Sequence, residues 1–470
     1  MSPRSTVVSS APDERPGRIL PIAEASPDIE AVRNSPLRII AVWLAACMLF
    51  LRISMLHQIQ TRMMHFNLRL LYIVGIPALL GTLLAGGVQR SFKGKPAYFY
   101  TAYAMWIAIA IPFSYWRGGS FNLLKDYLRT DMPMLFMVAG LAITWRECRI
   151  LMYAVAWGAA VNLLSAGLFA NETQYGYRAG MEFGSIANPN DFAGHLLLVL
   201  PFLLWVCLNS KNFIIKLAAF IGIGIGLKLM LATASRGAFI GLGVEVLFFL
   251  WRGTSRQRIA LLTLAPVAAG AMLLLVPSAA LRRIVSFSSD NITSAEQLEA
   301  IESSQSREYV LKKSIEYMFS HPIFGVGPGL FADYEGAHNT VFGVHGYWHD
   351  THNSFTQAGS ECGIPALCFL VGGILSTFFL LNRIYREAVM RPDCQDLRNA
   401  AFCIMLGFTG FVVATAFLNF AYFFYQPTMG GFAILLSVAA RDEMRLRASG
   451  APGTALVDPF YRFPSEAGSR

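Results

Sequence analysis

Long apolar runs separated by short polar connections dominate this sequence between about residue 38 and residue 440. A helix needs about 20 mainly apolar residues to cross the hydrocarbon core of a bilayer. The pattern therefore predicts an all-α integral membrane protein with about twelve transmembrane helices. They are placed at residues 38–56, 68–87, 97–116, 130–145, 150–169, 191–208, 213–233, 237–251, 259–277, 361–382, 399–419 and 427–440.

The composition agrees with a membrane protein and excludes a soluble enzyme. Of the 470 residues, 55% are hydrophobic and 14% are charged, whereas a soluble domain carries roughly 25% charged residues. The net charge of +9 is compatible with a nucleic-acid partner. However, the Lys and Arg residues form short clusters between apolar runs, which is typical of membrane loops. We expect membrane lipid, and no nucleic acid, as a partner.

The basic clusters also predict the orientation, because cytoplasmic loops collect Lys and Arg. With the N-terminus in the cytoplasm, every second connection between the predicted spans is basic, starting with Arg90, Lys93 and Lys95. One connection disagrees, since Arg52, Arg62 and Arg69 lie on the predicted outer side. Either the first span is short and re-entrant, or it lies partly along the interface.

Two tails and one long loop complete the predicted organisation. Residues 1–36 are polar and lack an apolar signal segment, so we expect a disordered cytoplasmic tail. The polytopic membrane domain spans 37–442, and 443–470 form a second cytoplasmic tail. The outer loop, at about 278–360, contains a stretch at 294–319 with apolar residues at helical spacing and no Pro or Gly. This stretch predicts an amphipathic helix.

Two arginines near this outer side are candidates for binding an anion. Arg236 lies at the outer junction of the predicted spans 213–233 and 237–251, and a guanidinium beside a helix N-terminus suits phosphate. The same position also suits an arginine that only snorkels to the interface. Arg307 lies on the amphipathic helix, where the sequence spacing by itself favours a solvated surface charge over a binding site.

Four of the eight histidines crowd into the end of the outer loop: His338, His345, His349 and His352. One interpretation is a metal site made by His349, Asp350 and His352, although the usual zinc spacings are absent. Another is a single general base working near neutral pH. The third is a hydrated polar loop.

Polar residues also interrupt or precede other apolar runs. The sequence Asn-Pro-Asn-Asp at 188–191 predicts a turn followed by a helix N-cap. His195, Lys228 and Glu245 lie within predicted spans, where a charge is costly, so we expect each to face the bundle interior.

Four segments in this order resemble the O-antigen ligase and polymerase superfamily of bacterial membrane glycosyltransferases. They are NPNDFAGHLLLVLPF, SRGAFIGL, SREYVLKKSIEYMFSHPIFGVGPGLF and HDTHNSFTQAGSECGIPALCFL. The resemblance covers roughly residues 178–382. It implies a multi-pass enzyme of the bacterial inner membrane that moves a glycan from an undecaprenyl diphosphate carrier to an acceptor hydroxyl on the periplasmic face.

The resemblance also implies roles for particular residues. By match of motif, His352 would be the catalytic base, Arg236 and Arg307 would bind the diphosphate, and no metal or other cofactor would take part. Asn353, Asn190 and Arg178 are further candidates for substrate contact. Direct attack by the acceptor would invert the anomeric centre, and two guanidinium groups would stabilise the leaving diphosphate.

The acceptor and the enzyme branch stay open. A ligase would use lipid A core oligosaccharide, a polymerase would use another lipid-linked repeat, and a third branch uses a protein hydroxyl. Other polysaccharide assembly proteins are expected partners. The alternative function is a transporter or flippase of lipid-linked glycans or small anions, which should show repeat symmetry. No such repeat is visible in the sequence.

The alternating basic loops generate a first testable prediction. Both termini should be cytoplasmic, and Arg307 should be exposed on the periplasmic side. Reporter fusions at both termini, combined with labelling of a cysteine introduced at position 307 by a membrane-impermeant reagent, check this arrangement. If position 307 is labelled only after the inner membrane has been permeabilised, the predicted arrangement is contradicted.

Overall fold

The computed structural model describes residues 34–169, 178–181, 184–276, 278–280, 295–338 and 349–449, and these contain helices and no strand. The first half consists of α2 (Pro36–Ser54), α3 (Leu56–Met64), α4 (Leu70–Leu84), α5 (Gly87–Ser91), α6 (Lys95–Ala110), η1 (Ile111–Phe113), α7 (Arg117–Asp126), η2 (Tyr127–Asp131), α8 (Pro133–Leu141) and α9 (Trp145–Phe169). The second half consists of α10 (Pro189–Asn209), α11 (Phe213–Ala232), α12 (Arg236–Arg252), α13 (Ser255–Leu275), α15 (Ala295–Ser320), α16 (Phe331–His338), α17 (Ser354–Val389), η3 (Pro392–Cys394), α18 (Gln395–Thr415) and α19 (Tyr425–Ala448).

Each of the twelve predicted spans coincides at least in part with one of these helices. Within the described residues, six segments are long and apolar enough to cross a membrane: α2, α9, α10, α11, α17 and η3 with α18. The chain is thus an all-helical, multi-pass membrane protein, while the count of twelve crossings stays a prediction. The helix expected at 294–319 is confirmed as α15.

The predicted span at 130–145 is part of a longer, broken path. The chain runs through α7, a π-helical turn at η2 and α8 before the backbone becomes extended at Ala142. A π turn inserts one extra residue into a helix and commonly occurs at functional sites. Here the turn ends at Asp131, whose carboxylate meets Arg52 of α2.

Burial separates the central helices from the peripheral ones. The apolar windows of α10 and α18 are both 78% buried, whereas that of α11 is only 17% buried. His195 on α10 and Glu245 on α12 are buried as expected. Lys228 is exposed on α11, so the expectation that it faces the interior is wrong. It lies about one turn from the end of the helix, where its long side chain can reach the polar boundary.

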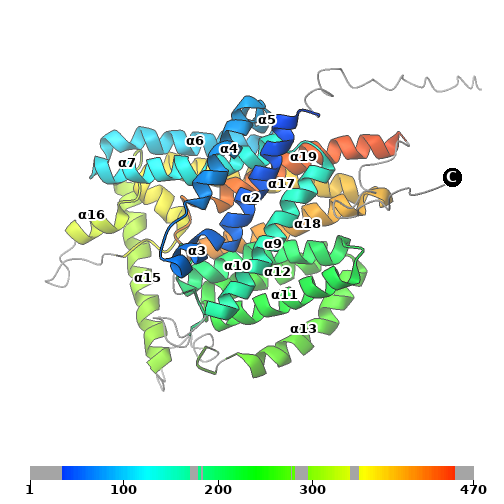
Figure 1. Cartoon of the computed structure of the whole chain (residues 1–470). Coiled ribbons are helices and arrows are strands. Elements are labelled where there is room, and N and C mark those ends of the chain that lie inside the picture. Colours follow the sequence, from blue (N-terminus) through cyan, green and yellow to red (C-terminus); the bar gives the residue numbers. More distant parts are fainter. Residues whose placement is uncertain are drawn as a thin grey trace, which may run out of the picture.

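The basic connections lie together at one end of the helices (Figure 1). Hydrogen bonds join the start of α2, the five connections that we predicted to be cytoplasmic and the end of α19 in the predicted C-terminal tail. The contacts are Arg38 with Glu147, Arg90 with the carbonyl of Gly140, Trp145 with Asp396, Asn399 with Asn209, Tyr385 with the carbonyl of Arg252, and Arg447 with Asp396. This grouping agrees with the alternation read from the sequence.

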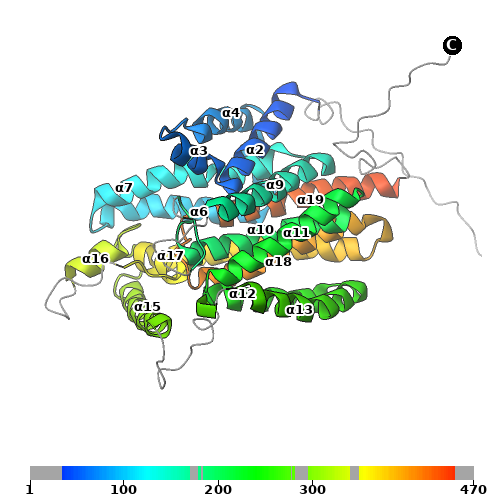
Figure 2. The ribbon, with the colours of Figure 1, turned by 60° about the horizontal axis from the view of Figure 1, so that its bottom comes forward.

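The remaining connections meet at the opposite end, where α15 packs against α17 beside α16 (Figure 2). Joining contacts include Gln58 with Ser185, Arg178 with the carbonyl of Thr233, and Tyr115 N–H with the carbonyl of Val326. Arg52 also belongs to this end, but it is mostly buried and its guanidinium is 2.5 Å from the Asp131 carboxylate. Its charge is therefore neutralised inside the protein. Arg62 and Arg69 of the same connection are exposed and still depart from the basic-loop pattern.

Candidate functional site

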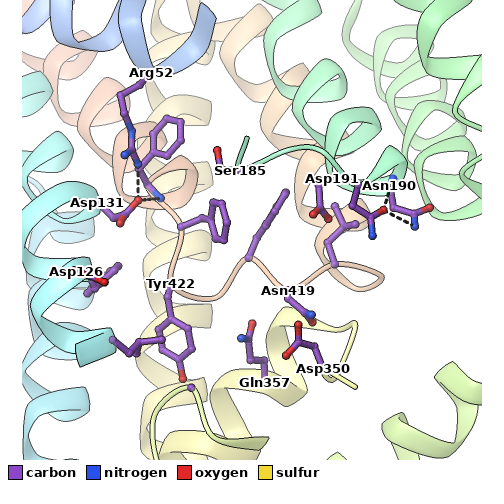
Figure 3. A pocket seen from close by; sticks show the side chains of 18 of the residues that line it. Arg52, Asp126, Asp131, Ser185, Asn190, Asp191, Asp350, Gln357, Asn419 and Tyr422 are labelled. Carbon is purple, nitrogen blue, oxygen red and sulfur yellow. Dashed lines mark hydrogen bonds and ion pairs between the residues drawn. The ribbon is translucent and has the colours of Figure 1, made fainter. Parts of the chain in front are cut away.

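A cavity of about 780 Å³ opens at this second end of the bundle (Figure 3). Its size lies within the usual range for ligand sites, roughly 300–1,000 Å³. The first half of the chain contributes α2 with α3, the start of α4, and α7 with η2. The second half contributes the start of α10, the start of α17 and the segment 416–424. The polar lining residues include Arg52, His57, Gln58, Asp126, Asp131, Ser185, Asn188, Asn190, Asp191, Asp350, His352, Gln357, Glu361, Asn419 and Tyr422.

The segment between α18 and α19 forms one wall because α17 holds it by hydrogen bonds. The Ser354 hydroxyl donates to the carbonyl of Leu418 (2.7 Å) and accepts from the Phe420 amide (2.8 Å). The Gln357 side-chain oxygen accepts from the Ala421 amide at 3.3 Å. These bonds satisfy the polar groups of a non-helical segment that would otherwise be buried without partners.

His352 lies at the entrance to α17 and lines the cavity. Its backbone is left-handed, with φ 48°, which is uncommon for a residue other than glycine and recurs at functional sites. The next residue, Asn353, caps α17 by accepting hydrogen bonds from the amides of Phe355 (2.9 Å) and Thr356 (3.1 Å). Asn353 therefore fixes the backbone from which the imidazole of His352 projects.

Arg307 of α15 is the basic residue that acts most directly on this histidine. Burial, together with the positive charges of Arg307 and His349, lowers the pKa of His352 to about 4. Arg307 also interacts electrostatically with Asp191 at the start of α10. The structure thus brings Arg307 and His352 together, and His352 is neutral at pH 7.

Arg178 joins the start of α10 to the turn before α12. Its guanidinium is buried and donates to the carbonyl of Thr233 (2.9 Å) and to the side-chain oxygen of Asn190 (3.0 Å). Arg236 is the first residue of α12 and is partly buried. Of the three arginines singled out from the sequence, none is among the described residues that line the cavity. Arg178 has the geometry of a positioning residue for this region, and Asn190 lies between it and the cavity.

The other histidines of the cluster separate in the structure. The His338 ring stacks on Tyr334 at 4.2 Å between ring centroids, near the end of α16. His349 is exposed and close enough to influence His352, while His345 lies outside the described residues. Within the described part of the chain, no group of three or more His, Cys, Asp or Glu side chains is arranged to hold a metal ion.

Several lining residues have no signal in a local motif. Arg52 and Asp131 are 79 positions apart, so only folding reveals their ion pair. Glu361 was visible as an acid inside a predicted span, which is a reason to suspect function. In the structure it accepts hydrogen bonds from the amides of Gly329 (2.9 Å) and Phe331 (3.4 Å) and from the Tyr422 hydroxyl (2.7 Å).

Glycines allow the 322–330 turn to lie directly on α17. The Val326 amide donates to the carbonyl of Ser360, and the Gly327 amide donates to that of Glu361, both at 2.9 Å. Gly363 has φ 82°, and a Cβ atom there would collide with the carbonyl of Ile323. The Gly-rich sequence thus brings α15 and α16 close to the cavity wall.

Comparison with known proteins decides the family of this region. Residues 218–371 match the O-antigen ligase family. The resemblance to the O-antigen ligase and polymerase superfamily is confirmed. The matched O-antigen ligase region runs from within α11 into α17 and contains Arg236, Arg307 and His352. No curated protein matches the chain.

The O-antigen ligase match at residues 218–371 supports a glycosyltransferase-like function for this membrane protein and does not favour the transporter alternative. A secondary transporter places its site near the bilayer midplane. The cavity of this O-antigen ligase-like protein instead lies where helices end, between connections of the chain.

The lowered histidine pKa values generate a prediction for stability. His57 also lines the cavity, and burial, opposed by its hydrogen bond to the carbonyl of Leu51, lowers its pKa to about 4. Between pH 6.5 and 4 the unfolded chain binds more protons at His57 and His352 than the folded chain, so stability falls as the pH falls. We expect a loss of about 1–2 kcal/mol per histidine by pH 5, relative to pH 8.

Thermal unfolding of the protein in detergent at pH 8 and pH 5 measures this loss. His57→Gln and His352→Gln should each reduce the difference in Tm between the two pH values. An undiminished pH dependence in both variants would contradict the assignment.

Proposed function

We propose that this protein transfers a glycan from undecaprenyl diphosphate to an acceptor hydroxyl at the periplasmic face of the bacterial inner membrane. The observation that carries the proposal is the neutral His352 on a cavity wall, with Arg307 close enough to depress its pKa. A neutral imidazole accepts a proton, and a nearby guanidinium attracts a diphosphate. The O-antigen ligase match supports this pairing because it contains both residues.

In the proposed reaction, His352 removes the proton of the acceptor hydroxyl while its oxygen attacks the anomeric carbon. The bond between oxygen and the anomeric carbon forms as the bond from that carbon to the diphosphate oxygen breaks. Undecaprenyl diphosphate leaves with the electron pair, and single displacement inverts the anomeric centre. Arg307 and Arg236 stabilise the negative charge that develops on the leaving group.

Residues outside the proposed chemistry hold the backbone on which His352 and Arg236 lie. Asn353 holds the first turn of α17 behind His352, and Arg178 holds the turn before Arg236 against Asn190. We assign Asn353 and Arg178 to positioning, and Asn190 to contact with substrate from the cavity wall. Lipid A core oligosaccharide, a lipid-linked repeat and a protein hydroxyl each supply a suitable acceptor, and polysaccharide assembly proteins would deliver it.

The proposal that two arginines replace a metal predicts resistance to chelation. Glycan transfer by the purified protein should keep its rate in EDTA, because guanidinium groups supply the positive charge at the diphosphate. The measurement is transfer from an undecaprenyl diphosphate oligosaccharide before and after chelation. Loss of activity that zinc restores would move the role to a metal bound near His349, Asp350 and His352.

The role of His352 predicts a loss of rate without a loss of donor binding. His352→Ala should fold and bind the lipid diphosphate, while transfer falls by at least about a hundredfold, the lower range for removing a general base. Arg307→Ala and Arg236→Ala should also weaken donor binding. Lys at either position should restore little, since an ammonium group cannot form the two parallel hydrogen bonds of a guanidinium.

Controls come from the same histidine cluster. His338→Ala and His349→Ala should lose far less activity, because His338 stacks on Tyr334 and His349 is exposed. Transfer assays and donor-binding assays are run on all variants at equal protein concentration. Wild-type rates in His352→Ala, or equal losses from all three histidine changes, would reject the base assignment.

A further inference from the structure

The cavity extends beyond His352 to a second region that the proposed chemistry does not use. In Figure 3, Asp191, Asn190, Asp350 and Asn419 lie on one side, and Arg52, Asp126 and Asp131 lie on the other. We call the second region, made by Arg52, Asp126, Asp131, Tyr422 and Phe424, the Arg52 end. It is formed by α2, α7, η2 and the 416–424 segment, all of which lie outside residues 218–371.

The polar groups of the Arg52 end are held rigidly. Asp131 accepts a hydrogen bond from Arg52 (2.5 Å), one from the Phe424 amide (3.1 Å) and one from the Thr130 hydroxyl (2.6 Å). The Arg52 guanidinium also lies over the Phe424 ring, 4.1 Å from its centroid. A site whose side chains are fixed before binding loses less entropy when a ligand arrives.

This combination of groups suits a pyranose ring. The hydroxyl groups of a sugar donate to carboxylates and accept from a guanidinium, and its apolar C–H face packs on aromatic rings. Tyr422, Phe423 and Phe424 supply rings along the same wall. Asp126, which is exposed and paired with Arg129 at 2.7 Å, adds a carboxylate at the margin of the cavity.

The charge of the lining restricts which sugars fit. Among the described residues that line the cavity there are five carboxyl side chains and one guanidinium, and Arg52 is already paired with Asp131. The lining histidines His57 and His352 have pKa values lowered to about 4, so neither adds positive charge at pH 7. Burial raises the pKa of Asp191 to about 7 and also raises that of Asp350, so these two carboxyl groups add less negative charge at pH 7. At the Arg52 end, Asp126 and Asp131 outnumber the single guanidinium, and an anionic group bound there would face this excess negative charge in a partly enclosed site that screens poorly.

We propose that the Arg52 end binds one uncharged or amine-bearing sugar residue of the acceptor glycan and discriminates against sugars that carry a carboxylate or phosphate. The acceptor identity rests on the proposed function. In that reaction the donor diphosphate lies near Arg307, which acts on His352 and Asp191 from the other side. The acceptor ring then occupies the cavity on the side of His352 away from Arg307.

Binding of three matched probes tests this charge preference without requiring transfer. The probes are methyl β-glucoside, methyl β-glucuronide and methyl 2-amino-2-deoxy-β-glucoside, and saturation-transfer NMR on the full chain in lipid nanodiscs measures their dissociation constants. We expect the glucuronide to bind roughly tenfold more weakly than the glucoside, equivalent to about 1.4 kcal/mol. The amino sugar should bind at least as well as the glucoside.

Variants locate the preference at the Arg52 end. Asp126→Asn and Asp131→Asn should each weaken amino-sugar binding and reduce the discrimination against the glucuronide by several fold. Glu387→Gln is the matched control, because Glu387 also pairs with an arginine at 2.8 Å but lies at the end of α17 that is far from the cavity. If Asp131→Asn fails to fold, exposed Asp126 still provides the comparison.

A further arm separates acceptor from donor sugars. A saturating concentration of undecaprenyl diphosphate oligosaccharide should leave the methyl glycosides bound. If this lipid-linked oligosaccharide displaces them and sugar-free undecaprenyl diphosphate does not, the subsite belongs to the donor and the inference is overturned. Equal or tighter glucuronide binding, no binding of any probe, or selectivity unchanged in both aspartate variants would also overturn it. Selective binding by a protein that transfers no glycan would reject the proposed function and retain the sugar subsite.

Discussion

A charged side chain between apolar helices must find a partner, because little water is present to solvate it. The ion pair between Arg52 and Asp131 meets this requirement at the end where the cavity forms. Asp131 also accepts the amide of Phe424, so one carboxylate joins α2, the π turn η2 and the segment before α19. The 416–424 wall is also held from α17, through the hydrogen bonds of Ser354 and Gln357.

The same constraint explains how charge is distributed around the cavity. Carboxylates and amides line it, while Arg307 and Arg236 lie outside the lining and within the O-antigen ligase region. For the proposed reaction this separation is useful, because a sugar and a diphosphate need different surroundings. In that proposal the sugar meets hydrogen-bonding groups of low positive charge, and the diphosphate meets the guanidinium groups outside the lining.

Backbone geometry, more than side-chain contact, determines where His352 points. The residue adopts a left-handed conformation between Thr351, whose hydroxyl lies 3.2 Å from the Asn419 side chain, and Asn353, which caps α17. Glu361 lies further along α17. Its carboxylate accepts hydrogen bonds from Gly329 of the Gly-rich turn and from Tyr422, and so holds both against this helix. The imidazole is thus placed by α17 and by two loops that come from distant parts of the chain.

The length and spacing of apolar residues were sufficient to predict an all-helical membrane protein and the α15 helix. The positions of Lys and Arg were sufficient to predict the alternation of basic connections, because each of these features depends on local composition. Motif order identified the O-antigen ligase region with Arg236, Arg307 and His352. Sequence could not reveal that Arg52 meets Asp131, that Arg178 is committed to Thr233 and Asn190, or that Lys228 is exposed. Those facts depend on which helix faces pack together, and contacts between positions far apart in the chain leave no periodic signal in a single sequence.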